Sequence, residues 1–321
     1  MAIETALTRL FGIEHPILLA PMGNVAGGAL AAAVSRAGGL GIIGGGYGNR
    51  EWLERELAAA GNEPVGVGFI TWSLALQPDL LDLVLGHAPK VMFLSFGDSR
   101  PFLPKIRKQG AKLILQVQNL AEVRAAKALG ADVIVAQGSE AGGHGSTRRA
   151  LFPFLPAAVD AAAPVPVVAA GGIADGRQVA AALLLGAAGV LVGTRFFASR
   201  EALGHANAKA RLVASSGDDT VRTHAFDIVR ELDWPAGYTG RAIANRLSQR
   251  WHDRDDAFKQ ALATEIPRYQ EAVAKGDFDT AVIFAGEGLD LVREVLPAAA
   301  IVERLMAETG TALAAGAGLL R

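Results

Sequence analysis

The chain of 321 residues contains no cysteine, which excludes disulfide bonds, thiolate-bound metal sites and thiol nucleophiles. It also lacks any block of like charges, and a formal net charge of −1 gives no electrostatic footprint for nucleic acid. No long uncharged apolar run occurs without turn signals inside it, so we predict no membrane-spanning segment. The opening "MAIETALTRLFG" is too polar for a signal peptide, and we therefore expect a cytoplasmic protein in a reducing compartment.

Short apolar runs rich in β-branched residues recur at even spacing up to residue 197. They are continuous rather than alternating, which is typical of parallel strands that are covered on both faces. We therefore predict strands at residues 16–20, 40–44, 65–70, 91–96, 112–117, 132–137, 165–170 and 189–193.

Amphipathic segments such as "NLAEVRAAKALG" and "DGRQVAAALLLG" lie between these runs. Both begin with a helix N-cap residue, Asn119 or Asp175, and both end in glycine, a common residue just after a helix. Eight strands that alternate with helices predict an α/β fold of the (β/α)8 TIM-barrel class. A doubly wound open sheet is the rival, but it usually has fewer strands.

The βα rhythm stops after residue 197, so we divide the chain into three regions. Residues 1–202 form the predicted barrel, and residues 203–284 a smaller, mainly helical cap over its mouth. Within the cap we expect a strand near 221–226, a Trp-Pro/Gly turn and a long charged helix over 253–275. Residues 285–321 contain a helix that we expect to dock back on the barrel.

Glycine is concentrated in the loops that follow the predicted strands. In a TIM barrel the loops at the carboxyl ends of the strands carry the chemistry, and those after strands seven and eight often bind phosphate. Here these two loops read "GGIADG" and "GTRF", so Gly171, Gly172 and Gly193 allow close backbone approach and Thr194 adds a hydroxyl. The sequence therefore predicts a phosphate site at this end of the barrel.

The loop after strand six, "QGSEAGGHGS" at 137–146, places His144 among glycines on the same face. An imidazole can exchange a proton near neutral pH, so we predict a catalytic role for His144. For Glu140 we favour a structural role, in which its carboxylate accepts backbone N–H groups of the loop.

Three segments together carry a family resemblance: "APMGNVAGGALAAAVSRAGGLGIIGGG", "GSEAGGHG" and "PVVAAGGIADGRQVAAALLLGAAGVLVGTRF". They resemble the nitronate monooxygenase family, which also includes FMN-dependent enoyl-[acyl-carrier-protein] reductases. The resemblance implies an FMN-binding TIM barrel in which His144 is the active-site histidine. It places the FMN phosphate on Gly171, Gly172, Gly193 and Thr194, and it places Pro21, Met22 and Gly23 beside the flavin ring. Gln116 would then lie at the polar edge of the ring, with Ala141, Gly142 and Gly143 close to the cofactor.

Two positions depart from the pattern of the family. Relatives often have glycine where this chain has Ser146, and they tend to have glutamine where it has Glu287. If Glu287 reached the site, its negative charge would disfavour an anionic substrate.

The activity that the resemblance implies is oxidation of alkyl nitronates by FMN and O2 to a carbonyl compound and nitrite, with no metal. An NAD(P)H-dependent reductase of enoyl thioesters or quinones is the alternative, with Arg211, Arg222 or Arg241 of the cap as candidate phosphate ligands. A third alternative is a non-catalytic barrel that binds a phosphate ligand. Assembly into a homo-oligomer is left open.

Overall fold

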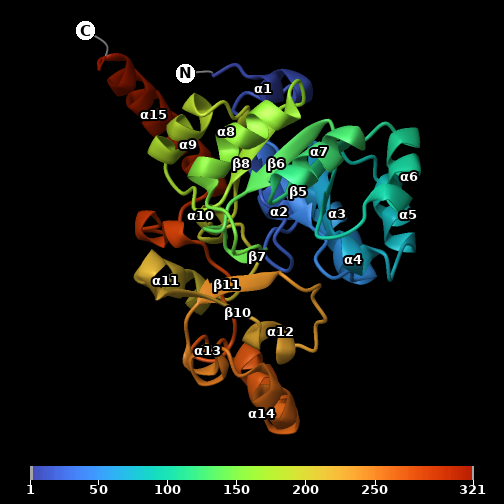
Figure 1. Ribbon diagram of the computed structural model, residues 1–321, viewed down its shortest axis with the longest axis vertical. Helices are drawn as coiled ribbons and strands as arrows, with labels where there is room; N and C mark the ends of the chain where they lie inside the picture. Colours follow the sequence, from blue (N-terminus) through green and yellow to red (C-terminus); the bar gives the residue numbers. More distant parts are fainter. Residues whose placement is uncertain (1–2, 320–321) are drawn as a thin grey trace.

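The computed structural model describes residues 3–319 and shows a barrel of eight parallel strands with a second lobe below its mouth (Figure 1). The predicted TIM barrel is confirmed, and every predicted barrel strand is found within two residues of its expected ends. The barrel strands are β1 (Ile17–Leu19), β2 (Gly41–Gly44), β3 (Val65–Ile70), β4 (Val91–Ser95), β5 (Lys112–Val117), β6 (Val133–Gln137), β8 (Val167–Ala170) and β9 (Gly189–Val192).

The strands follow one another around the barrel in chain order, from β2 through β6 and β8 to β9, and β9 pairs with β1. A parallel bridge between Leu18 of β1 and Leu40, just before β2, closes the circle. All eight carboxyl ends therefore meet at one mouth, so the loops that follow the strands lie together there, as predicted.

Helices surround the barrel and cover its outer face. Asn119 and Asp175 cap the helices that follow them, as predicted, through hydrogen bonds from the backbone N–H groups of Glu122 and Gln178. The barrel helices are α1 (Ala6–Phe11), α2 (Gly28–Arg36), α3 (Arg50–Ala60), α4 (Thr71–Leu74), α5 (Asp79–Gly86), α6 (Leu103–Lys108), α7 (Leu120–Ala128), α8 (Leu151–Ala162), α9 (Gly176–Leu184) and α10 (Thr194–Phe197), with a 3₁₀ turn η1 (Arg100–Phe102).

Each barrel strand contributes to two cores because successive side chains point to opposite faces. Leu18, Ile42 and Phe93 belong to the cluster inside the barrel, which Leu7 and Phe11 of α1 close at the end opposite the mouth. The neighbouring strand residues point outward into the larger cluster beneath the helices.

The cap contains four helices and a small antiparallel sheet. Its sheet has the order β10-β11-β7, where β7 (Gly143–Gly145) comes from the barrel loop after β6. The expected strand near 221–226 is present but shorter, because α12 begins at Ala225. The cap elements are α11 (Ala206–Ala214), η2 (Gly217–Asp219), β10 (Thr220–Thr223), α12 (Ala225–Ile228), β11 (Thr239–Ile243), α13 (Arg246–Trp251) and α14 (Asp255–Lys275).

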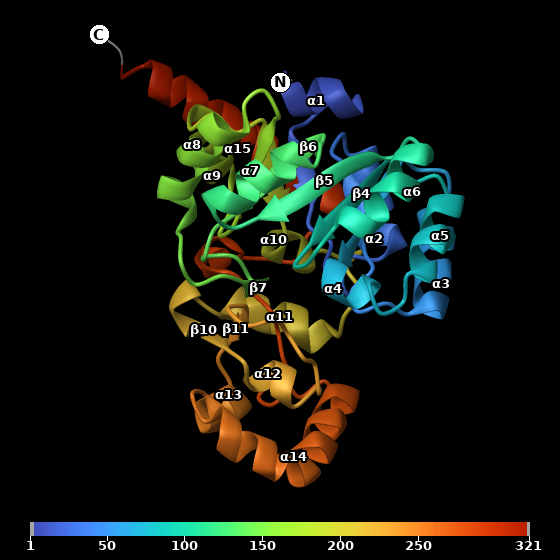
Figure 2. The same cartoon turned by 45° about the vertical axis from the view of Figure 1, so that its right-hand side comes forward.

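The predicted charged helix is α14, which lies farthest from the barrel and is visibly bent (Figure 2). Pro267 in its middle lacks a backbone N–H, a common cause of such bends. The cap has its own apolar core, in which Phe226, Trp251 and Phe258 are buried.

The chain returns to the barrel through η3 (Glu287–Leu291) and ends in α15 (Ala298–Ala317), which packs against α9 and α2. The limits 1–202, 203–284 and 285–321 stay predictions, and residues 1, 2, 320 and 321 of the outer regions lie outside the described residues. No helix within residues 3–319 is long and apolar enough to cross a membrane.

Candidate active site

A cavity of about 770 Å³ opens at the mouth of the barrel, between the carboxyl ends of the strands and the cap. The structure brings all twelve predicted site residues to its wall, although they come from five separate loops or strand ends. They are Pro21, Met22, Gly23, Gln116, Ala141, Gly142, Gly143, His144, Gly171, Gly172, Gly193 and Thr194.

One side of the cavity presents unused backbone donors. Within residues 3–319, the N–H groups of Gly171, Gly172 and Ile173 have no hydrogen-bond partner, and those of Gly193 and Thr194 have none either. Gly171 and Gly172 have φ angles of 122° and 67°, a backbone region that favours glycine. The Thr194 hydroxyl accepts a hydrogen bond from Gly286 at 3.0 Å and keeps its own proton to donate. These groups form a cradle that suits a phosphate.

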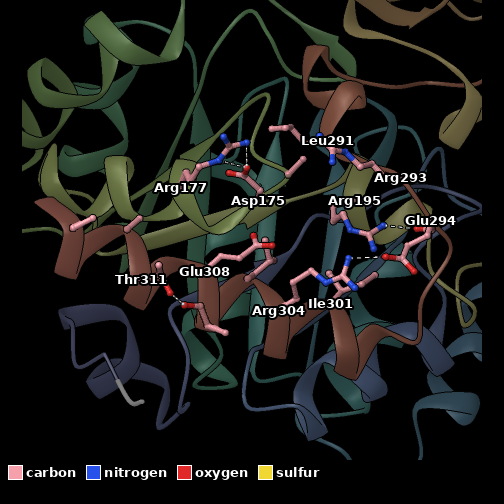
Figure 3. Close-up of a pocket in the computed structure, with 15 residues that line it drawn as sticks. Asp175, Arg177, Arg195, Leu291, Arg293, Glu294, Ile301, Arg304, Glu308 and Thr311 are labelled. Atoms are coloured by element: carbon pink, nitrogen blue, oxygen red, sulfur yellow. Dashed lines mark hydrogen bonds and ion pairs between the residues drawn. The ribbon is translucent and has the colours of Figure 1, made fainter.

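Arg195 follows Thr194 in the chain and lies outside the wall of the first cavity. The residue is only 4% exposed, and its side chain donates to the backbone oxygen of Glu294 at 3.0 Å. It extends into a second cavity of about 830 Å³ between α9, α10 and α15 (Figure 3). Two ion pairs line this second cavity, with Arg177 bound to Asp175 and Arg304 bound to Glu294 (Figure 3).

Two glycines outside the predicted set let the Pro21–Met22 segment approach its neighbouring strands. A Cβ atom on Gly44 would lie 2.4 Å from the Met22 backbone, and one on Gly68 would lie 2.4 Å from the Pro21 ring. Neither distance is tolerated, so both positions require glycine for this packing. The Met22 sulfur in turn lies close to Gly193, which joins this segment to the phosphate side of the cavity.

A chain of glutamine amides ties the histidine loop to the barrel. The Gln137 oxygen accepts hydrogen bonds from Gln116 at 3.2 Å and from Gln118 at 2.5 Å. The Gln137 amide group donates to the backbone oxygen of His144 at 3.2 Å, and the Gln118 oxygen accepts from the Ser146 N–H. Gln116 therefore lines the cavity and also donates to Gln137, and the backbone of Ser146 is held by Gln118.

His144 lies at the centre of β7, opposite Gly240 of β11, and its side chain is 7% exposed. Its Nε2 atom lies 2.9 Å from both carboxylate oxygens of Asp227 in α12. Burial lowers the pKa of His144 below its usual range, although the Asp227 carboxylate acts in the opposite direction. The imidazole is therefore neutral near pH 7 and ready to accept a proton.

Aromatic side chains cover the histidine on the cap side. The His144 ring lies flat against Trp234, and the Trp234 N–H donates to the Tyr47 hydroxyl at 3.0 Å. Phe284 lies on another side of the imidazole, and Phe96 packs edge-on against Trp234. These rings cover part of the imidazole, which also lines the cavity.

Several charged residues considered in the sequence lie outside the cavity wall. The Glu140 carboxylate accepts the backbone N–H of Leu151 at 2.8 Å, the kind of structural role favoured above. Glu287 forms an ion pair with Arg241 at 2.7 Å, so its charge is not directed at the cavity.

The three cap arginines considered in the sequence also have their partners outside the cavity. Arg222 donates to backbone oxygens that include Ser139, and burial lowers its pKa to about 10. Arg241 binds the same Ser139 oxygen, and Arg211 lies 3.7 Å from Asp279. None of the three lines the cavity.

Sequence reasoning missed the cap residues nearest to His144, namely Asp227, Arg230 and Trp234. They lie 83 or more positions away along the chain and reach the histidine only because β7 pairs with β11. The one available signal was the group of aromatic and charged residues in "FDIVRELDW", which has no characteristic spacing. Within the described residues, no group of three His, Asp or Glu side chains is arranged to hold a metal.

The nitronate monooxygenase family model matches residues 4–70 and 69–308. A nitronate monooxygenase from Neurospora crassa is 32% identical over 95% of this chain and 93% of its own length. FabK from Thermotoga maritima has a TM-score of 0.86 with 30% identity, covering 99% of this chain and 100% of its own.

A third similar protein is a nitroalkane oxidase from Streptomyces ansochromogenes. Its structure has a TM-score of 0.80 with 30% identity, covering 97% of this chain and 99% of its own. The match covers both the barrel and the cap. The chain is an oxidoreductase that belongs to the nitronate monooxygenase family.

Proposed function

We propose that this enzyme binds FMN at the mouth of the barrel and oxidises alkyl nitronates with O2 to a carbonyl compound and nitrite. The observation that carries the proposal is the joint placement of two features on one cavity wall. The unused N–H groups of Gly171, Gly172, Gly193 and Thr194 fit a phosphate, and His144 lies on the same wall.

The rest of the wall also fits a flavin. Pro21 and Met22 provide an apolar surface for a flat ring, and Gln116 provides an amide that can donate to a polar ring edge. When bound, FMN would take electrons from the substrate and pass them to oxygen.

The protein's own contribution is to manage a proton and exclude water. His144, neutral at pH 7, accepts the α-proton of a neutral nitroalkane and so forms the nitronate in place. Within residues 3–319, Arg230 is the one lysine or arginine that lines the cavity, and its charge is paired with Asp227. The aromatic wall around His144 keeps competing water away from the reacting carbon.

The reductase alternative requires a site for the phosphates of a nicotinamide cofactor. The arginines suggested for this purpose, Arg211, Arg222 and Arg241, lie outside the cavity wall and are occupied by other partners. This arrangement favours the nitronate reaction.

An anaerobic titration of the FMN-loaded protein tests the proposal. We expect the flavin absorbance to change on addition of ethyl nitronate and to stay unchanged with NADH or NADPH. Rapid bleaching by either nicotinamide, with no response to the nitronate, would instead identify a reductase. A purified protein that retains no FMN after loading would favour the non-catalytic barrel.

A further inference from the structure

We propose that Asp227 is a positioning residue that holds His144 in its Nε2–H form and thereby makes Nδ1 the atom that accepts the substrate proton. This inference rests on the proposed function, in which His144 is the base. It assigns a task to α12, a cap helix whose residues carry no motif.

The geometry determines which nitrogen carries the hydrogen. Nε2 lies 2.9 Å from each oxygen of Asp227, and an ionised carboxylate can only accept hydrogen bonds. Nε2 must therefore donate, and in a neutral imidazole the lone pair is then on Nδ1. Nδ1 has no hydrogen-bond partner within residues 3–319 and retains accessible surface, while His144 lines the cavity.

The carboxylate is itself fixed in place. Asp227 is 3% exposed, and Arg230 donates to its Oδ1 atom at 2.8 Å. Arg230 also donates to the backbone oxygen of Phe226 at 2.7 Å, which ties the guanidinium to α12. The paired guanidinium holds the buried carboxylate in place, so the carboxylate can orient the imidazole.

The charges around His144 make Asp227 the one group that favours proton uptake. Arg230, from the turn after α12, and Arg222, from β10, both disfavour a second positive charge, as does burial itself. The Tyr47 phenol, whose pKa burial raises, stays neutral near pH 7. Removal of the Asp227 charge would therefore leave a weaker base, with a lower pKa.

The first test needs only the wild-type protein. Long-range ¹H–¹⁵N spectra of protein labelled in the histidine rings distinguish the two neutral forms of imidazole. We expect the His144 resonance, assigned by its loss in His144→Gln, to show the Nε2–H form. An Nδ1–H form would overturn the proposal, and this result requires no activity and no altered Asp227.

The second test compares two substitutions at Asp227. Asp227→Asn keeps an oxygen that can accept from Nε2 but loses the charge, so we expect the Nε2–H form with a lower His144 pKa. Asp227→Ala loses both, and we expect a mixture of the two forms. An unchanged pKa in Asp227→Asn would contradict the inference.

Turnover separates positioning from general damage. For Asp227→Asn we expect kcat/KM with neutral nitroethane to fall about 100-fold, as for impaired general-base catalysis, and kcat/KM with ethyl nitronate to fall by less than about threefold. Equal losses on both substrates would refute the positioning role. Glu265→Gln is the matched control, because Glu265 is a buried cap carboxylate paired with Arg250 and Arg268.

Different results would refute the proposed function and the role of Asp227. If wild-type protein turns over neither ethyl nitronate nor nitroethane, the proposed function is wrong, whatever the ring spectra show. If it does turn over nitroethane but His144 is in the Nδ1–H form, the base assignment survives and the role of Asp227 is refuted.

Discussion

The imidazole of His144 and the indole of Trp234 lie face to face, with ring centroids 3.5 Å apart and planes inclined by 3°. Trp234 thus shields one face of the proposed base from water, and burial is the main cause of the lowered His144 pKa. We expect Trp234→Ala to admit water and raise the pKa of His144 toward its ordinary value. Because the base must be unprotonated, the acidic limb of kcat/KM for nitroethane should then move to higher pH.

A control with the same substitution is available in the cap core. Trp251 stacks on Phe258 with planes also inclined by 3°, but it does not line the cavity. Trp251→Ala should lower the melting temperature and leave the pH profile in place. A downward shift of the limb in Trp234→Ala would show that stacking, rather than shielding, dominates.

The role of His144 predicts a difference between substrates. In His144→Ala, we expect kcat/KM with neutral nitroethane to fall by about 10²–10⁴-fold, the usual contribution of a general base. Preformed ethyl nitronate needs no proton removal and should be affected far less. FMN content should match that of wild type, and His87→Ala, at an exposed position after α5, is the control. Equal losses with both substrates would argue against proton abstraction by His144.

The phosphate cradle predicts that a side chain at Gly172 will deplete FMN. Gly172 has a φ of 67°, and Gly12, at the exposed end of α1, has a φ of 65° with open space around it. Valine in the left-handed region costs about 1–2 kcal/mol. We expect Gly172→Val to be purified with little FMN and Gly12→Val to retain it, as measured by flavin absorbance after desalting. Full occupancy in Gly172→Val would place the phosphate elsewhere.

Arg195 predicts an effect on the cofactor from outside the cavity. Arg195→Met would leave the Glu294 oxygen without its donor, at a cost of about 1–3 kcal/mol in unfolding free energy. Because Thr194 is adjacent, we also expect faster FMN dissociation. Arg177→Met is the control, since Arg177 is mostly exposed and pairs with Asp175 at the surface. An unchanged FMN dissociation rate would show that the cradle does not depend on Arg195.

The Glu287–Arg241 pair predicts a small effect where the sequence suggested a large one. Glu287→Gln should change stability by less than about 1 kcal/mol, because the carboxylate is 44% exposed and Arg241 keeps its bond to Ser139. The kcat/KM with ethyl nitronate should stay within about twofold of wild type, since this charge is directed away from the cavity. A large gain would mean that the charge of Glu287 acts on the anionic substrate.

The barrel and the gathering of the twelve predicted residues at its mouth were predictable because both depend on local sequence. Continuous apolar runs fix the strands, Asn119 and Asp175 cap their helices, and glycines at strand ends such as Gly171 mark the loops that meet at the mouth. These signals need no knowledge of distant contacts.

The surroundings of His144 were not predictable for the opposite reason. The three residues of β7 have two glycines and low strand propensity, so only the partner strand β11 makes them a strand. Asp227 and Trp234 then reach the imidazole because of that pairing, and no residue spacing in the sequence predicts the pairing.

The strand β7 has a consequence for engineering this fold. The histidine belongs to the barrel by sequence but to the cap by hydrogen bonding, because β7 is an edge strand of the cap sheet. A chimaera that grafts another cap onto this barrel would therefore exchange the electrostatic and aromatic environment of the base together with the substrate lid. In such hybrids, exchange of the cap would change substrate specificity and proton transfer at the same time. The cap is therefore not an interchangeable module.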